Sequence, residues 1–366
     1  MKSKETTVRY AVVGLGYIAQ AAMLPGFAGA KKNSRLTALI SGEPKKLKVL
    51  GKHLKVQNLF SYEQYDEFLA SGVADAVYIA LPNTLHREYA VKAANAGLHV
   101  LCEKPMATTE KECRDMMGAA RRNNVRLMIA YRLHFDRANI EAINIIKSGK
   151  IGDPRYFHSS FSRQVPNGDI RLEKKLGGGT LWDMGIYCIN AARYLFRDEP
   201  TQALAVSVKG TGPRFQEVDE MTAATLSFPG DRIATFTSSF GAAESTFCEV
   251  IGTKGSVRLE PAFDYSVPLT LQLTIGEKKT TRKMPKYGQF AAQLVYFSEC
   301  VLTGRVPEPS GLEGMADVNI IRALYRSAEK GRPVKLAPIR DHKTIRTSQE
   351  MTLTAPGKPE LVDVSS

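Results

Sequence analysis

Three polar side chains stand where the sequence around them is apolar or glycine-rich. Lys104 follows the apolar segment 99–102 and precedes Pro105, so a charged amine is held beside a buried strand. Asp183 and Tyr187 lie four residues apart after a run of three glycines, and this spacing puts them on one face of a helix. An amine, a carboxylate and a phenol can transfer protons and stabilise developing charge. We therefore predict that Lys104, Asp183 and Tyr187 are catalytic.

Plainer explanations exist for each of these residues. A lysine at the end of a strand is often an ordinary surface residue. An aspartate near the start of a helix is stabilised by the helix dipole, and a tyrosine beside it can be half-buried for packing alone. An acid and a phenol on a face that also carries Ile186 and Ile189 would cost free energy without a partner or a task. The sequence favours catalysis and leaves the structural explanation open.

A glycine-rich pattern follows the first apolar segment, residues 8–13. Gly14, Gly16 and Ala19 form the pattern Gly-x-Gly-x-x-Ala at the start of a helical segment. Gly14 allows a tight turn, Gly16 lets a pyrophosphate approach the backbone, and Ala19 keeps helix and strand close. A purely structural turn is the alternative. We predict a dinucleotide-binding loop with contacts from Gly14, Gly16, Tyr17 and Ile18.

The end of the second predicted strand bears on which dinucleotide is bound. An NAD site usually has an acid there to hold the ribose 2′-hydroxyl, but this chain has Ser41, followed by Lys46. A hydroxyl and an ammonium suit the 2′-phosphate of NADP. Glu43 is the exception, because an inward-pointing carboxylate would favour NAD. We predict NADP, with Ser41 and Lys46 as contacts, and keep NAD as the less favoured alternative.

Further candidates follow the later predicted strands. His86 is equally explained as a histidine at the start of a helix, and Arg132 is equally explained by a structural ion pair. The remaining predicted cofactor contacts are Ala80, Asn83, His86, Glu103, Lys104 and Arg132, and the predicted substrate contacts are Arg171 and Tyr287.

The elements that must position these residues fall into two patterns. From residue 8 to residue 130, short apolar segments alternate with amphipathic ones, which predicts an α/β fold with a doubly wound parallel sheet. Thr109 and Glu112 have the spacing of a helix capping box. The predicted strands are residues 8–13, 36–40, 76–80, 99–102 and 126–130.

The pattern changes after residue 132. Alternating strands at 203–208, 221–228, 233–239 and 256–259, joined by short turns, predict a large, open, mainly antiparallel sheet. We expect helices at 289–302 and 312–330 to pack on this second domain. The predicted domains are an NAD(P)-binding Rossmann domain at 1–132, an α+β domain for substrate and oligomer contacts at 133–336, and a C-terminal tail or arm at 337–366.

Composition argues against several other functions. The net charge is +13, and residues 31–55 carry eight lysines and arginines against one acid, but no nucleic-acid module accompanies them, so we expect no nucleic-acid partner. The chain has no apolar run near the roughly 20 residues that span a bilayer, and its start is polar, which predicts no membrane partner and a cytoplasmic location. Five scattered cysteines without ligand spacing predict buried thiols and no metal.

The motifs together resemble one enzyme family. Residues 14–19, Glu103-Lys104-Pro105 and residues 178–187 are similar to motifs of the Gfo/Idh/MocA oxidoreductases, and residues 297–304 and 314–317 are similar to the closing helices of that family. The resemblance covers about residues 8–335. Tyr187 replaces the histidine of many members and, with Ser41, Gly42 and Lys46, resembles the glucose-fructose oxidoreductase branch.

The resemblance implies NADP-dependent hydride transfer between nicotinamide and a sugar or polyol, with Lys104 and Asp183 in the family's catalytic positions. We assign proton transfer to Tyr187 and orientation of the lysine or a sugar hydroxyl to Asp183. The alternatives are an NADPH-dependent reductase of a ketosugar such as 1,5-anhydrofructose, and a non-catalytic dinucleotide sensor. The open sheet implies a homodimer or homotetramer.

Overall fold

The first of two sheets is parallel and six-stranded. The computed structural model describes residues 6–337, 339, 345, 349–351, 353–357 and 359–364. The strand order β3-β2-β1-β4-β5-β6 reverses between β1 and β4, which is the point where doubly wound sheets bind dinucleotides. The strands are β1 (Val8–Val13), β2 (Ser34–Ile40), β3 (Asn58–Phe60), β4 (Ala76–Ile79), β5 (His99–Cys102) and β6 (Leu127–Ile129).

Helices cover both faces of this sheet because successive strand residues point to opposite sides. Val13 and Ile40 belong to one hydrophobic cluster, whereas Val12 and Leu39 belong to another on the opposite face. The connecting helical segments are η1 (Ala19–Met23), α1 (Leu24–Gly26), η2 (Phe27–Gly29), α2 (Pro44–Leu54), α3 (Tyr65–Ala70), η3 (Asn83–Leu85), α4 (His86–Asn95) and α5 (Glu110–Arg122).

The start of α5 matches the predicted cap in part. The Thr109 hydroxyl accepts a hydrogen bond from the Glu112 amide at 3.2 Å, as expected. The Glu112 carboxylate, however, accepts from the backbone and the hydroxyl of Thr108 at 3.1 and 2.9 Å, one residue before the capping threonine. The helix therefore begins where the sequence predicts, with the reciprocal bond displaced by one residue.

The second sheet has nine strands in the described residues, and only its β7–β10 pair is parallel, so the predicted fold class is confirmed. Its order is β14-β13-β12-β11-β7-β10-β9-β8-β15. The strands are β7 (Pro154–Ser162), β8 (Gln202–Val208), β9 (Met221–Phe228), β10 (Arg232–Ser239), β11 (Ser245–Gly252), β12 (Gly255–Leu259), β13 (Thr270–Ile275), β14 (Lys278–Lys283) and β15 (Val334–Lys335).

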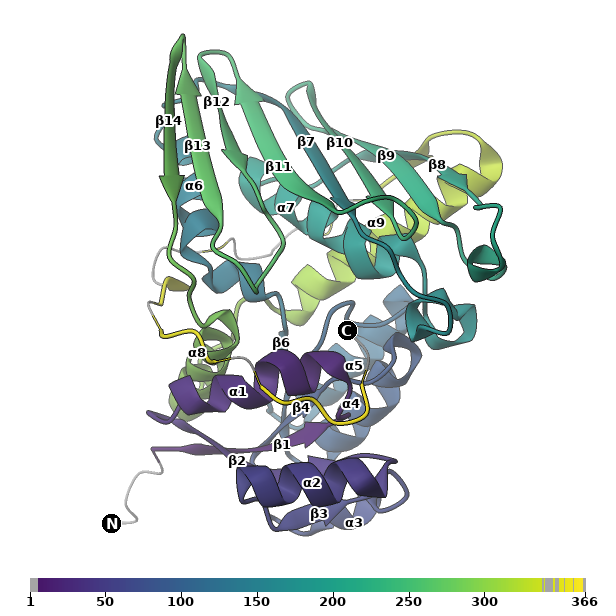
Figure 1. The fold of residues 1–366 in the computed structure, drawn as a ribbon, viewed down its shortest axis with the longest axis vertical. Helices are drawn as coiled ribbons and strands as arrows, with labels where there is room; N and C mark the ends of the chain where they lie inside the picture. The colour runs from purple at the N-terminus through teal and green to yellow at the C-terminus, as the bar shows by residue number, and fades with distance from the viewer. Residues whose placement is uncertain are drawn as a thin grey trace.

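Three helices cover one face of the second sheet and leave the other open (Figure 1). They are α6 (Arg137–Lys147), α7 (Ile186–Phe196) and α9 (Gly311–Lys330), and the one-turn segment η4 (Arg132–Phe135) joins β6 to α6. Smaller helical turns are η5 (Ile170–Leu172), η6 (Lys174–Leu176), η7 (Leu181–Gly185) and η8 (Pro213–Phe215). Since η7 runs straight into α7, it brings one end of this helix toward the first sheet.

The helix α8 (Gln289–Thr303) packs mainly on the first domain and not on the second, so that expectation is wrong. The Tyr10 hydroxyl of β1 lies 2.7 Å from the Ser298 hydroxyl, and the Asn33 side chain donates to the Val295 carbonyl at 2.9 Å. Phe290 and Leu294 share a buried cluster with the first sheet. In its packing, α8 belongs to the first domain although it follows the second in sequence.

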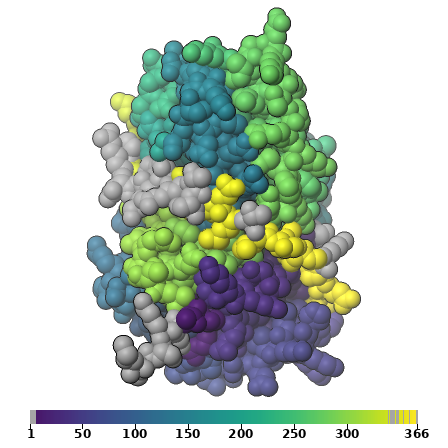
Figure 2. Space-filling view, turned by 90° about the vertical axis from the view of Figure 1, so that its left-hand side faces the viewer, coloured from purple at the N-terminus to yellow at the C-terminus, as the bar shows by residue number. Residues whose placement is uncertain are grey.

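The C-terminal tail runs as an arm along the molecule where it is described. The Leu353 carbonyl accepts a hydrogen bond from the Gly288 amide at 2.8 Å, and Thr354 pairs with Tyr287. Figure 2 shows the yellow C-terminal segment lying beside α8 and over the purple N-terminal residues. Among the helices of the described residues, none combines the length and apolar character needed to cross a membrane.

Candidate active site at the edge of the first sheet

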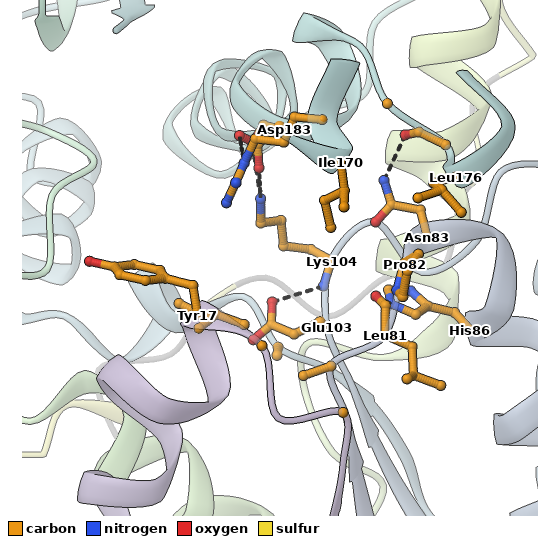
Figure 3. A pocket seen from close by; sticks show the side chains of 18 of the residues that line it. Tyr17, Leu81, Pro82, Asn83, His86, Glu103, Lys104, Ile170, Leu176 and Asp183 are labelled. Atoms are coloured by element: carbon orange, nitrogen blue, oxygen red, sulfur yellow. Dashed lines mark hydrogen bonds and ion pairs between the residues drawn. The ribbon is translucent and has the colours of Figure 1, made fainter. Parts of the chain in front are cut away.

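A cleft of about 500 Å³ lies at the carboxyl edge of the first sheet and extends to the second domain. It receives the loops that follow β1, β2, β4, β5 and β6. From the second domain it receives the glycine run before η7, together with side chains near the ends of β7 and β12. Figure 3 shows Lys104 extending from the first sheet toward Asp183 across this cleft.

The glycine-rich loop has the shape that its sequence predicts. Gly14 has a φ of +94°, and a Cβ there would lie 2.4 Å from the Ala80 carbonyl oxygen, so only glycine fits without strain. A Cβ at Gly16 would meet nothing within 4 Å, which leaves open space above the backbone. Tyr17 and Ile18 also line the cleft. The loop therefore offers room for a pyrophosphate at the start of a helix.

The loop after β2 brings Ser41, Glu43 and Lys46 to one end of the cleft. The Ser41 hydroxyl accepts from the Glu43 amide at 3.2 Å, which fixes the turn. Lys46 is buried, and its ammonium lies 2.5 Å from the Glu43 carboxylate, whose side chain is 56% exposed. Glu43 thus pairs with Lys46, and the Ser41 hydroxyl and the Lys46 ammonium lie in the same cleft.

The loop after β4 links the two domains at the cleft. Asn83 donates from its side chain to the Gly177 carbonyl at 2.8 Å, as Figure 3 shows. His86 begins α4, is fully buried, and has its two ring nitrogens 2.8 and 2.9 Å from the carbonyl oxygens of Pro105 and Leu81. Burial lowers the pKa of His86. The geometry favours a structural role for this histidine, although it lines the cleft beside Ala80.

Lys104 is held from both domains. Its ammonium donates to the Asp183 backbone carbonyl at 2.9 Å and to the Asp183 carboxylate at 3.3 Å. Glu103 lies beneath it, accepting from the Lys104 amide at 3.2 Å and from the Tyr78 hydroxyl at 2.6 Å. Burial raises the pKa of Glu103. The predicted lysine is therefore a positioned group rather than a surface residue.

Asp183 is surrounded by positive charge. The Arg171 guanidinium donates to its carboxylate at 2.9 Å, and Arg163 lies 3.9 Å from the same oxygen. Burial alone would raise the pKa of Asp183, but Arg171, Lys104 and Arg163 together hold it well below its usual range. Asp183 also raises the pKa of Arg171, which binds Asp169 as well. A permanently ionised Asp183 can orient a cation or accept a hydrogen bond, but it cannot deliver a proton near neutral pH.

The Tyr187 ring contacts two cations. The Lys104 ammonium is 4.6 Å from the ring centroid, and the Arg132 guanidinium carbon is 5.1 Å from it. Phe161 and Phe263 pack on the same ring with centroids 5.5 and 5.8 Å away. Tyr187 and Asp183 both line the cleft, so the predicted spacing does place them on one face.

Arg132 is buried and held by polar contacts that the sequence does not reveal. Its guanidinium donates to the Gln289 side chain at 2.7 Å and to the Phe263 carbonyl. Gln289 in turn donates to the Asp136 carboxylate at 2.9 Å. Arg132 also forms cation–π contacts with the rings of Tyr187 and Tyr265. Within the described part of the chain, these contacts and the hydrogen bonds take the place of the ion pair that the sequence left open.

Tyr287 alone among the predicted site residues lies elsewhere, so its assignment to the cleft is not supported. Its hydroxyl accepts from Arg137 at 3.2 Å, and its backbone pairs with Thr354 of the tail. It immediately precedes α8, and that helix packs on the far side of the first sheet from α4 and α5.

Several lining residues were not predicted. Phe161 and Arg163 are two residues apart near the end of β7, and this period-two spacing is the available signal. Within the described residues, no group of three or more His, Cys, Asp or Glu side chains is arranged to hold a metal ion. The other unpredicted polar and aromatic lining residues include Tyr62, Glu244, Thr246, Phe263, Asp264 and Tyr265.

Comparison with known proteins identifies both domains. Residues 8–131 match the model of the oxidoreductase family with an NAD-binding Rossmann fold, and residues 140–258 match the GFO/IDH/MocA C-terminal domain. The D-xylose 1-dehydrogenase [NADP(+)] of Haloarcula marismortui is 33% identical over 91% of this chain and 94% of that protein.

Solved structures give the same answer. The aldose-aldose oxidoreductase of Caulobacter crescentus, solved with glycerol, has a TM-score of 0.86 and 39% identity, covering 90% of this chain and all of that one. A 3-ketoreductase of Actinomadura kijaniata, solved with NADP and TDP-benzene, has a TM-score of 0.81 and 25% identity, covering 88% and 98% of the two chains. The family predicted from the motifs is confirmed: this chain belongs to the GFO/IDH/MocA oxidoreductases.

Proposed function

We propose that this protein is an NADP-dependent oxidoreductase that transfers hydride between the nicotinamide and a sugar, with an aldose as the sugar. The observation that carries the proposal is the contact of Lys104 with both Asp183 and Tyr187 in the cleft that the glycine-rich loop also lines. The relatives named for D-xylose and aldose oxidation support the choice of an aldose.

The residues of the cleft fit NADP. The open space at Gly16 suits the pyrophosphate, while Ser41 and Lys46 suit the 2′-phosphate. Asn83, Glu103, Arg132 and Tyr187 line the same cleft. When bound, the nicotinamide supplies the acceptor or donor of the hydride.

The chain's own residues supply proton transfer and charge. Tyr187 accepts or delivers the proton of the reacting sugar hydroxyl. Lys104 lies over the face of the Tyr187 ring and provides positive charge for the oxygen that becomes negative. Asp183 holds the Lys104 ammonium in place, and Arg171 keeps Asp183 ionised and oriented. The roles of Asp183 and Arg171 are therefore to position the lysine.

The cleft also suits a polyhydroxylated substrate. Phe161 and Phe263 form an apolar wall next to Tyr187, on which the carbon-hydrogen face of a sugar ring can pack. Glu244, Thr246 and Asp264 supply hydrogen-bonding groups to the same cleft. Sugars carry these two kinds of surface together, which supports the substrate class.

The test combines substrate and cofactor. Purified protein is incubated with NADP⁺ or NAD⁺ and with D-xylose, D-glucose, another aldose or a polyol, and in the reverse direction with NADPH and 1,5-anhydrofructose; absorbance reports the reduced dinucleotide. We expect turnover of at least one aldose with NADP⁺. Turnover of 1,5-anhydrofructose alone would replace the aldose proposal with the ketosugar reductase, and dinucleotide binding without turnover on any sugar would favour a sensor.

Lys46→Ala tests the cofactor end of the cleft. Because a hydrogen bond to a charged group contributes about 1.5–3 kcal/mol, we expect NADPH to bind roughly 10- to 100-fold more weakly and NADH to be little affected. Lys48→Ala, an exposed lysine on the same helix, is the matched control. Equal losses for NADPH and NADH would contradict the assignment of Lys46 to the 2′-phosphate.

We also propose that the protein is a homodimer or homotetramer formed through the open face of the second sheet. The exposed side chains of Val208 and Met221 are paired across the neighbouring strands β8 and β9, and those of Ile233 and Tyr156 are paired across β10 and β7. Apolar patches of this kind commonly mark interfaces. Light scattering of the full chain tests this, and a monomer at micromolar concentration would contradict it.

The five buried free cysteines support the proposed cytoplasmic location.

A further inference from the structure

The end of the C-terminal arm reaches the glycine-rich loop through one buried side chain. Gln20 is 2% exposed, and its amide nitrogen donates to the Leu15 carbonyl at 2.8 Å and to the Val362 carbonyl at 3.0 Å. Its amide oxygen accepts from the Val362 backbone N–H at 2.8 Å. Leu15 lies between Gly14 and Gly16, so the arm is joined through Gln20 to the loop that would carry the pyrophosphate.

A second contact joins the arm to α2. Asp363 lies 2.9 Å from the ammonium of Lys45, which stands in the first turn of α2 beside Lys46. The Val362 side chain packs on the hydrophobic cluster between the first sheet and η1. In Figure 1 the yellow segment passes between the helix that follows β1 and α2, as these contacts require.

The arm is anchored elsewhere before it reaches this point. Leu353 accepts from the Gly288 amide, and the Gln349 side chain donates to the Glu308 carbonyl at 2.9 Å. Both Gln349 and Glu308 are buried. Residues 359–364, which we call the strap, therefore follow a portion of the arm that is already docked. Fixing the strap costs less conformational entropy than fixing a free terminus.

We propose that residues 359–364 brace two elements that flank the cofactor site and so slow the release of the dinucleotide, an inference that rests on the proposed function. The segment joins the two elements on either side of the adenosine end, the glycine-rich loop through Gln20 and α2 through Lys45. A dinucleotide seated between these elements leaves when they separate. The strap opposes this separation, so it slows the release of NADPH and favours a cofactor that stays bound between successive sugar substrates.

The test measures release of NADPH from preformed complexes, by stopped-flow fluorescence after mixing with excess NADP⁺. Removing residues 359–366 deletes the two hydrogen bonds to Gln20 and the ion pair, and we expect release roughly 10- to 30-fold faster. The thermal midpoint of the cofactor-free chain is measured alongside, to show that the truncated protein is folded.

A pair of point variants isolates the contact to Gln20. Val362→Pro removes the N–H that donates to Gln20, whereas Val362→Ala keeps it and shortens the same side chain. We expect Val362→Pro to release NADPH roughly fivefold faster than Val362→Ala, the factor for about one net hydrogen bond. This pair also decides the matter if the truncated chain does not fold.

The outcomes separate this proposal from the one on which it rests. Faster release from the truncated chain and from Val362→Pro, with Val362→Ala close to the native rate, supports the strap. Equal release rates for the native and truncated chains, or for the two point variants, overturn it while leaving the oxidoreductase function intact. Failure of the full native chain to bind NADPH or NADH would overturn the proposed function itself, and the strap with it.

Discussion

Two clusters of charged side chains in this protein use the same residue types in opposite proportions. The cleft cluster consists of Lys104, Arg163, Arg171 and Asp183, so three cations surround one carboxylate. The core cluster consists of Arg193, Glu199, Glu313 and Asp317, so three carboxylates surround one guanidinium. The aspartates respond in opposite directions: cations hold the pKa of Asp183 well below its usual range, whereas burial raises the pKa of Asp317 to about 7.

Location explains the difference. Asp183 retains 24% side-chain exposure at the cleft, so water and a substrate can reach it, while Asp317 has none. Arg193 of α7 contacts Asp317 of α9 at 2.7 Å and Glu199 beyond α7 at 2.7 Å, which fastens the helices under the second sheet. An ion cluster that is open to a cleft can therefore position a reactive side chain, whereas a fully buried cluster holds helices together.

The largest effect is expected from Lys104→Met, which removes a cation from the cleft cluster. Asp183 keeps Arg171 at 2.9 Å, so the fold should be unchanged, but sugar turnover should fall by on the order of 10³-fold. Steady-state rates and a thermal midpoint measure the two properties. Lys111→Met, at an exposed lysine, is the control for Lys104→Met. Tyr187→Phe should reduce turnover by a factor comparable to that of Lys104→Met. A Lys104→Met enzyme within tenfold of the native rate would remove this lysine from the chemistry.

The core cluster should respond in stability instead. Arg193→Met leaves buried carboxylates without their common cation, and we expect a loss of about 3–5 kcal/mol in the free energy of unfolding. Urea unfolding measures it. Arg87→Met breaks an exposed pair with Asp115 and should cost about 0–1 kcal/mol. If the two variants lose the same amount, the core cluster does not fasten the helices as its burial suggests.

The sequence is informative for the cleft cluster and much less so for the way distant elements pack. Lys104, Asp183 and Tyr187 stand in short motifs at strand and helix ends, where local pattern determines position. The packing of α8 was predicted wrongly because its residues 289–298 are buried on every side, so the sequence pattern does not select a partner. The choice is made by contacts such as Tyr10 with Ser298, far apart in the chain. Arg163 was missed because it follows an ordinary strand, and only the fold brings it near Asp183.

The smallest effects concern how pH acts on the two aspartates. The pKa of Asp317 in the folded state, about 7, lies above its ordinary value of 3.8, so the folded protein keeps a proton that the unfolded chain releases. Its contribution to stability is present below about pH 4 and is lost as pH rises through 7, at roughly 1 kcal/mol per pH unit. Asp183 has the opposite sign: its contribution is present above its ordinary pKa and is lost as pH falls below it.

Urea unfolding of Asp317→Asn and Asp183→Asn across pH 3 to 8 separates these contributions. Asp317→Asn should flatten the decline in stability between about pH 4 and 7, because the substituted amide has no proton to release. Asp183→Asn should leave that interval unchanged and reduce the loss of stability below about pH 4. If the two variants show the same dependence of unfolding free energy on pH, the pKa values of Asp183 and Asp317 are not shifted in opposite directions. The cleft cluster and the core cluster would then differ in burial alone.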